Sequence, residues 1–212
     1  APAVTLSADP DPTYTEQAAG VPFDANLTLA DVDHANLASA TVAIAAGRGT
    51  GDTLEFTETG SISGTYTSGT ATLSLSGSAT KAAWQTVLRS VRFSNDLDDP
   101  TTATRTLELV VSDGSASSTA RTRNLTFTSV DDAPVLTTTA SVLGYAEGAP
   151  ATAIDPALAL ADADSTSLTG ATAAITSGFA AAEDVTVARW SAQRQADVFE
   201  RAFGRTLRVS GP

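Results

Sequence analysis

Residues 105–112 read RTLELVVS, a stretch in which apolar and polar side chains alternate. Successive side chains of a β-strand point to opposite faces of the sheet, so this alternation predicts a strand with one buried face. The same alternation, bounded by turn residues, occurs at 3–8, 40–45, 53–57, 71–76, 91–94 and 122–130. Seven short strands separated by turns predict an all-β fold, a β-sandwich.

One segment between these strands has a helical period. Within residues 81–88 apolar side chains recur at i, i+1, i+4 and i+5, and Thr80 precedes them as an N-cap. We therefore expect one short helix that closes an end of the sandwich, with Trp84 packed against the core. The alternative for Trp84 is an exposed platform for a ligand.

The charge of the chain limits its partners. Among 212 residues there are 24 acidic and 12 basic ones, which gives a formal net charge of −12. Such a charge repels nucleic acid and anionic lipid and attracts cations. No apolar run reaches the length of a membrane span, so we expect no membrane insertion, and any targeting signal is expected outside this sequence.

Residue types that carry catalysis are scarce. The chain has no cysteine and one histidine, His34, which excludes thiol catalysis and a zinc site built from several histidines. No serine lies in a Gly-x-Ser-x-Gly sequence. We therefore predict that the chain is not an enzyme and that His34 is a solvated loop residue.

An internal repeat organises the chain. Residues 29–33 read LADVD and return as LADAD at 160–164, and ATVAI at 40–44 returns as ATAAI at 171–175. Two further blocks keep the same order: APA at 1–3 with APV at 133–135, and YTE at 14–16 with YAE at 145–147. All four blocks return at a near-constant offset, which is the same from Glu16 to Glu147 as from Asp31 to Asp162. This self-similarity predicts a first repeat over 1–131 and a second over 132–212.

The second copy is expected to be partial. Residues 185–204 diverge from the first copy, and nothing follows that matches residues 78–130. The alignment on both sides favours strands for 185–204, whereas the local spacing of its apolar residues favours a helix. A sandwich that lacks its closing strands exposes unpaired edges, so we expect the second copy either to be less stable than the first or to be completed in trans by another chain.

Four short motifs in one order suggest a family. They are Tyr-x-Glu, Asp-x-Asp, the Asp113-Gly114 pair and the VDDAP sequence of residues 130–134. Together they resemble the cadherin-like tandem repeats of large bacterial surface adhesins, including haemolysin-type (RTX-like) ones. The resemblance covers the first copy and the start of the second, before the divergent stretch 185–204. It implies a cadherin/immunoglobulin-like Greek-key β-sandwich, a secreted or cell-surface location, and Ca²⁺ bound where adjacent repeats of the chain meet.

The acidic motifs suit calcium chemically. Ca²⁺ takes six to eight oxygen ligands, and an Asp-x-Asp sequence in an extended loop turns two carboxylates the same way. We expect one ion to be surrounded by Asp131, Asp132, Glu147, Asp162 and Asp164. The resemblance gives the same role in the first copy to Glu16, Asp31, Asp33 and Asp113. The alternatives are solvated acidic turns and a metal-free interface.

Two functions agree with these observations. The first is a non-catalytic structural spacer of an adhesin, stiffened by Ca²⁺. The second is a module that binds a glycan or a protein through exposed Thr and Ser side chains or through the glycine-rich stretch 47–51, which we expect to be a mobile turn. A sandwich fold supports either function.

Overall fold

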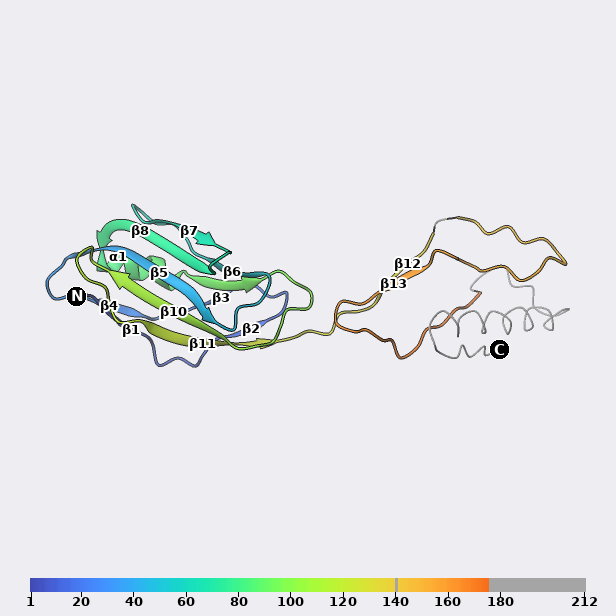
Figure 1. Cartoon of the computed structure of the whole chain (residues 1–212), viewed down its shortest axis with the longest axis horizontal. Helices are drawn as coiled ribbons and strands as arrows, with labels where there is room; N and C mark the ends of the chain where they lie inside the picture. The colour runs from blue at the N-terminus through green and yellow to red at the C-terminus, as the bar shows by residue number, and fades with distance from the viewer. Residues whose placement is uncertain (140, 176–212) are drawn as a thin grey trace. The chain divides into compact units, whose positions relative to one another are not determined.

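The computed structural model describes residues 1–139 and 141–175. The chain divides into two compact units, Ala1–Asp131 and Asp132–Pro212, at the boundary that the repeat predicts (Figure 1). The divergent stretch 185–204, for which the alignment favours strands and the local spacing favours a helix, lies outside the described residues. In the described part of the chain, no helix has the length and apolar character needed to cross a membrane.

Unit 1 is a β-sandwich with one short helix, as the alternation predicts (Figure 1). Its larger sheet has the order β2-β11-β10-β5-β8-β7, and its smaller sheets are β3-β9-β6 and β1-β4. The elements are β1 (Ala3–Thr5), β2 (Thr13–Thr15), β3 (Val21–Pro22), β4 (Thr28–Ala30), β5 (Asn36–Ala46), β6 (Asp52–Glu55), β7 (Ser63–Thr67), β8 (Thr72–Thr80), α1 (Lys81–Arg89), β9 (Arg92–Asn95), β10 (Arg105–Ser112) and β11 (Arg121–Thr128).

The core of unit 1 follows from the alternation in its long strands. In β10, Leu107, Leu109 and Val111 are fully buried while the residues between them are only partly buried. The strands β5 and β8 bury their own alternate apolar residues in the same cluster. Because β10 lies between β5 and β11, the most regular strand of the sequence lies inside the sheet.

The helix and its tryptophan are where the sequence predicts them. Thr80 Oγ1 accepts a hydrogen bond from Ala83 N at 3.3 Å, which makes Thr80 the N-cap of α1. Trp84 is fully buried and its Nε1 donates to Leu37 O, so this side chain belongs to the core. Gln85 Oε1 accepts from Leu29 N, which attaches the helix to β4.

Four strands of unit 1 were not predicted from the sequence: β2, β3, β4 and β7. Three of them have only two or three residues, too few to show a period. The fourth, β7, has the sequence SGTYT, in which one large side chain gives no clear alternation. These strands form through pairing with distant partners, as β2 does with β11.

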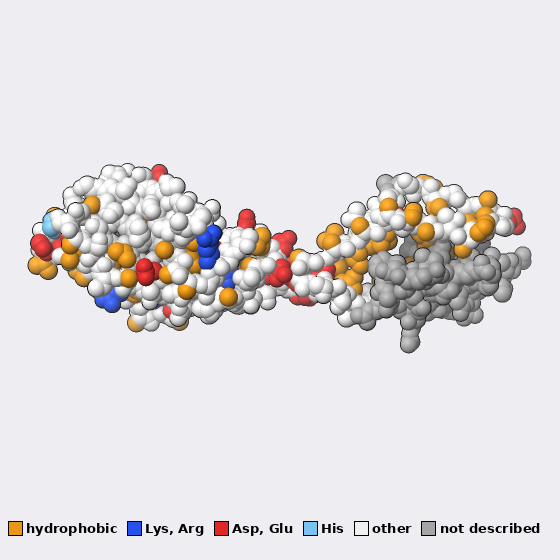
Figure 2. All heavy atoms as spheres, viewed as in Figure 1, with side chains coloured by type: hydrophobic (Ala, Val, Ile, Leu, Met, Phe, Trp, Pro, Cys, Tyr) orange, Lys and Arg blue, Asp and Glu red, His pale blue; other side chains and the backbone are white. Residues whose placement is uncertain are grey.

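The described part of unit 2 repeats the start of unit 1. Its strands β12 (Val135–Thr137) and β13 (Ala159–Ala161) pair antiparallel, with Leu136 opposite Leu160. In unit 1 the pair β1–β4 places Val4 opposite Leu29 in the same register. Most large apolar side chains in the described part of unit 2 are nevertheless exposed, and Figure 2 shows apolar side chains at its surface.

The repeat also extends to individual hydrogen bonds. Asp24 accepts from the backbone N–H groups of Ser7 and Asn26, and in unit 2 Asp155 accepts from those of Thr139 and Ala157, at the equivalent positions. In the same way the Tyr14 hydroxyl donates to Ala18 O and the Tyr145 hydroxyl to Ala149 O. The two copies therefore share local structure as well as sequence.

Candidate metal centre

The Asp-x-Asp sequence of unit 1 forms the tight loop between β4 and β5. Asp31 Oδ1 accepts hydrogen bonds from the backbone N–H groups of Asp33 and His34, both at 3.1 Å. Burial raises the pKa of the Asp31 carboxyl, but these backbone hydrogen bonds outweigh it and leave the pKa below its ordinary value. The loop therefore holds Asp31 as an anion. Its second carboxylate oxygen, Oδ2, takes no part in the hydrogen bonds of this turn.

Asp113 reaches the same place from the turn that follows β10. Its Oδ1 accepts from Ser115 N at 2.6 Å and from Ala116 N at 2.7 Å. These two hydrogen bonds lower the pKa of the Asp113 carboxyl. Its Oδ2 lies 3.4 Å from His34 Nδ1, and the Asp113 side chain is only 1% exposed.

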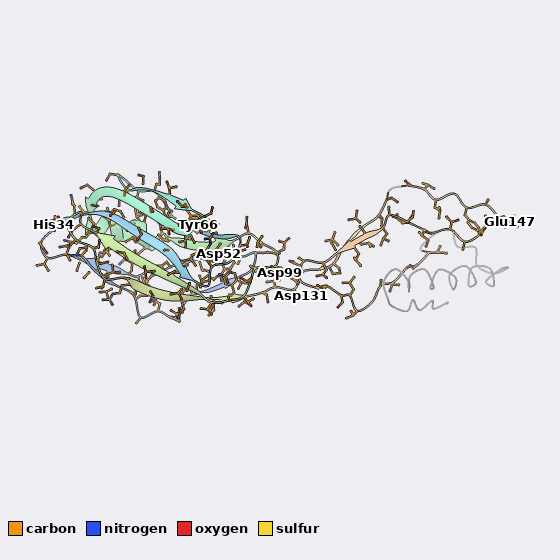
Figure 3. All side chains as sticks on the ribbon, in the orientation of Figure 1. His34, Asp52, Tyr66, Asp99, Asp131 and Glu147 are labelled. Atoms are coloured by element: carbon orange, nitrogen blue, oxygen red, sulfur yellow. The ribbon has the colours of Figure 1, made fainter. Side chains whose placement is uncertain are left out.

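Together these loops form a compact group of possible ligands, here called the Asp31 cluster: Asp31, Asp33, His34 and Asp113. One ligand atom from each of Asp31, Asp33 and His34 lies within 4.8 Å of the others. Three atoms of the cluster are buried without a hydrogen-bond partner: Asp31 Oδ2, His34 Nδ1 and Asp113 Oδ2. Figure 3 labels His34 at the end of unit 1, and Figure 2 shows acidic side chains beside the histidine.

One lysine neighbours this cluster. Lys81 Nζ donates to the backbone carbonyls of Asp31 and His34, at 3.1 and 2.7 Å. Lys81 thus fixes the backbone of the loop and leaves the carboxylates of Asp31 and Asp113 to other partners.

The interpretation of His34 as a solvated loop residue is wrong for its Nδ1. The side chain is 42% exposed, yet Nδ1 is buried and faces Asp113 Oδ2. No local sequence pattern could show this contact, because it joins the loop after β4 to the turn after β10, much further along the chain.

Glu16 does not join the Asp31 cluster, so the grouping expected from the resemblance is wrong in this respect. Glu16 follows β2, and its Oε2 accepts from Val130 N at 2.9 Å. It therefore lies where β11 ends, whereas Asp113 lies beside the start of β11. Because β2 and β4 end at opposite ends of the sandwich, their carboxylates are kept apart.

In unit 2 the predicted ligands are brought together only in part. Asp162 Oδ1 accepts from the N–H groups of Asp164 and Ser165, which repeats the Asp31 turn, and Asp132 N donates to Asp164 Oδ2 at 2.5 Å. Glu147 lies apart from them, in the loop that leads away from β12 and β13 (Figure 3). The structure does not bring Glu147 to these aspartates, and its role as a ligand stays a prediction. Asp131 ends unit 1, and its role as a ligand stays a prediction.

A second polar group, in unit 1, was not identified from the sequence. Arg105 and Asp52 form a buried ion pair through Nε–Oδ2 and Nη2–Oδ1 contacts of 3.0 and 3.1 Å. The guanidinium also lies 4.1 Å from the centre of the Phe127 ring. Asn95 Nδ2 bonds both Asp52 Oδ1 and Thr50 O, so the stretch 47–51, expected to be a mobile turn, is attached to the core.

A depression opens beside this buried pair. It has a volume of about 500 Å³ and is lined by residues 48–53 together with Ser68 and Asp96. Gly47 takes a left-handed conformation at φ 72°, and a Cβ there would collide with the carbonyl of Thr104. The shape of this loop therefore depends on glycine.

No protein-family model matches the chain, and no curated protein or solved structure is significantly similar to it. The geometry of the chain itself thus carries the functional argument.

Proposed function

We propose that this chain is a non-catalytic repeat module of a secreted or cell-surface bacterial adhesin, a cadherin-like spacer that Ca²⁺ stabilises. One observation carries the proposal: the chain builds the same local structure twice in succession, down to the hydrogen bonds of Asp24 and Asp155. Tandem modules of this kind add length in regular steps, which is what a spacer requires.

The Asp-x-Asp turns support the calcium part of the proposal. In each copy the first aspartate, Asp31 or Asp162, uses Oδ1 to close the turn on the backbone. This leaves Oδ2 of the first aspartate and the carboxylate of the next one as hard oxygen donors. Weak sites of this kind serve outside the cell, where calcium is plentiful.

A calcium titration of the full chain tests the proposal. We expect a heat of binding and a higher melting temperature in millimolar Ca²⁺ than in chelator, at matched ionic strength. At a Ca²⁺ concentration of about a hundred times Kd, binding to the native state alone adds about 2.7 kcal/mol of stability. The double variant Asp162→Asn/Asp164→Asn should lose part of this gain, and Asp98→Asn/Asp99→Asn should keep it. Identical melting curves with and without Ca²⁺ would reject the calcium-stabilised spacer.

A second candidate function is the binding of a hydroxyl-rich ligand such as a glycan. It is favoured by the depression beside Asp52, whose lining includes the side chains of Arg48, Thr50, Thr53, Ser68 and Asp96. Polar groups fixed in a concave site select ligands by hydrogen bonding. A saturable signal on a glycan array that Ser68→Ala and Asp96→Ala remove would support this function, and an array without any signal would reject it.

A further inference from the structure

The imidazole of His34 gives the Asp31 cluster a ligand that calcium does not use. Ca²⁺ takes oxygen ligands, whereas imidazole nitrogen suits zinc and other divalent transition metals. In this cluster Nδ1 of His34 is buried, has no hydrogen-bond partner and faces the carboxylate of Asp113. The donor set is therefore one imidazole nitrogen with carboxylate oxygens, and zinc accepts both of these ligand types.

We propose that Asp31, Asp33 and His34, whose ligand atoms lie within 4.8 Å of one another, form a zinc site at this end of unit 1, together with Asp113, whose Oδ2 lies 3.4 Å from His34 Nδ1. This inference deepens the proposed function, since it rests on the Asp31 cluster binding a cation, and it changes which cation that is. Asp31 and Asp113 each supply Oδ2, and His34 supplies Nδ1.

The separation of one pair of donor atoms, His34 Nδ1 and Asp113 Oδ2, fits zinc. Ligands about 2.0–2.1 Å from zinc and arranged as a tetrahedron lie about 3.3–3.4 Å from one another. His34 Nδ1 and Asp113 Oδ2 are 3.4 Å apart. In addition, Oδ1 of Asp31 and Oδ1 of Asp113 accept hydrogen bonds from backbone N–H groups. The orientation of both carboxylates is therefore set before any ion binds. Backbone hydrogen bonds of this kind position metal-ligating carboxylates.

Buried oxygen atoms without a partner strengthen the argument. Asp31 Oδ2 and Asp113 Oδ2 are removed from water and accept no hydrogen bond. Burying an anion without a compensating partner is unfavourable, and a bound dication supplies that partner. Lys81 does not, because its ammonium group is bonded to two backbone carbonyls.

The rival interpretation is a simple ion pair between protonated His34 and Asp113. Charge-assisted N–H···O bonds are about 2.7–2.9 Å long. The observed separation of 3.4 Å is longer, and the two atoms do not form a hydrogen bond. The distance thus favours an ion between the two atoms over a proton.

The repeat supplies a matched control. The residue of unit 2 equivalent to His34 is Ser165, whose N–H group closes the Asp162 turn as that of His34 closes the Asp31 turn. The variant His34→Ser therefore installs a residue that the same turn already accommodates. We expect zinc binding in unit 1 and none of this kind in unit 2.

The single histidine makes a direct test possible. In the ¹⁵N-labelled full chain, all imidazole nitrogen signals come from His34, and Zn²⁺ added in the presence of about 1 mM Ca²⁺ should shift the Nδ1 signal at one equivalent. Calorimetry should show that His34→Ser raises the Kd for Zn²⁺ at least about tenfold. Co²⁺ bound in place of zinc should give the visible absorption of a tetrahedral site.

A second variant protects the test against loss of folding. Asp113→Asn keeps Oδ1 as an acceptor for the turn and removes the charge of Oδ2, so it should weaken Zn²⁺ binding while Asp99→Asn does not. An unmoved Nδ1 signal, or equal Zn²⁺ affinity in His34→Ser and the wild type, would overturn the zinc site. If Ca²⁺ still raises the melting temperature in that case, the proposed function stands; if neither cation has an effect, both fail.

Discussion

The two copies of the repeat share several hydrogen bonds of their turns, but equivalent apolar side chains are buried in unit 1 and exposed in unit 2. Phe23 is 1% exposed and its equivalent Ile154 is 65% exposed, and Leu27 and Leu158 are 0% and 36% exposed. Yet Asp24 and Asp155 accept the same backbone hydrogen bonds. The difference shows that the turns are local properties of each copy, whereas the burial in unit 1 also involves strands from later in the chain.

Arginines of β11 illustrate the contribution of those later strands. Arg121 donates to Val4 O, and Arg123 donates to the carbonyls of Ser7 and Asp9 and lies 3.4 Å from Asp24 Oδ2. They tie the N-terminal segment of unit 1 to its larger sheet. Within residues 132–139 and 141–175, Asp155 has contacts to Thr139 and Ala157 and no ion pair.

Truncation of equivalent leucines should give the largest difference in unfolding free energy between a change in unit 1 and the same change in unit 2. Leu27→Ala removes a fully buried side chain from the core of unit 1, and such changes destabilise proteins by about 2–5 kcal/mol. Leu158→Ala, at a partly exposed position, should leave the unfolding of unit 1 unchanged. Urea unfolding followed by Trp84 fluorescence in a Trp190→Phe background measures both. An equal loss of stability in Leu158→Ala would contradict the expectation that this leucine does not support the core of unit 1.

Replacing Asp24 or its equivalent Asp155 should give a smaller difference in stability between the two variants than the leucine pair does. Asp24→Asn keeps an acceptor for Ser7 but leaves the guanidinium of Arg123 buried without an anion, which should cost about 2–3 kcal/mol. Asp155→Asn should not alter the urea midpoint of unit 1. The double variant Asp24→Asn/Arg123→Leu recovers part of the loss if the unpaired charge is its cause. Without such recovery, the lost hydrogen bonds of Asp24 are the better explanation.

Much of this fold could be predicted from the sequence, because an element that buries one face shows a regular spacing of apolar residues. The strand β10 was predicted with its observed bounds, and α1 to within one residue, since each buries one face along its whole length. The short strand β2 could not be predicted, because its position depends on pairing with β11, which lies near the other end of unit 1 in the sequence.

The candidate site was predictable only as far as its local motifs. Asp31 and Asp33 belong together because one turn holds them. Glu16 lies away from these aspartates, and His34 lies beside Asp113. To predict either position, one has to know which end of the sandwich each loop occupies. That information lies in the strand order, which no short motif contains.

The smallest expected effect concerns the hydrogen bond that both copies keep. Asp155 has a pKa below its ordinary value of 3.8, mainly because Thr139 N donates to its carboxylate, with further hydrogen bonds from the Thr139 hydroxyl and Ala157 N. A carboxyl whose pKa is lowered by folding stabilises the folded state above its unfolded pKa, and this contribution is lost as the pH falls through the folded pKa. The loop of residues 139–157 should therefore loosen only below about pH 4.

The amide signal of Thr139 reports this titration directly. In an NMR pH series we expect it to move with a midpoint below 3.8, since protonation of Asp155 removes the negative charge that its N–H group binds. In Asp155→Asn the oxygen acceptor remains but cannot titrate, so the Thr139 signal should lose this pH dependence. A midpoint at or above 3.8 in the wild type would mean that the backbone donors do not stabilise the carboxylate. The bond that unit 2 shares with unit 1 would then be a coincidence of turn geometry without an energetic role.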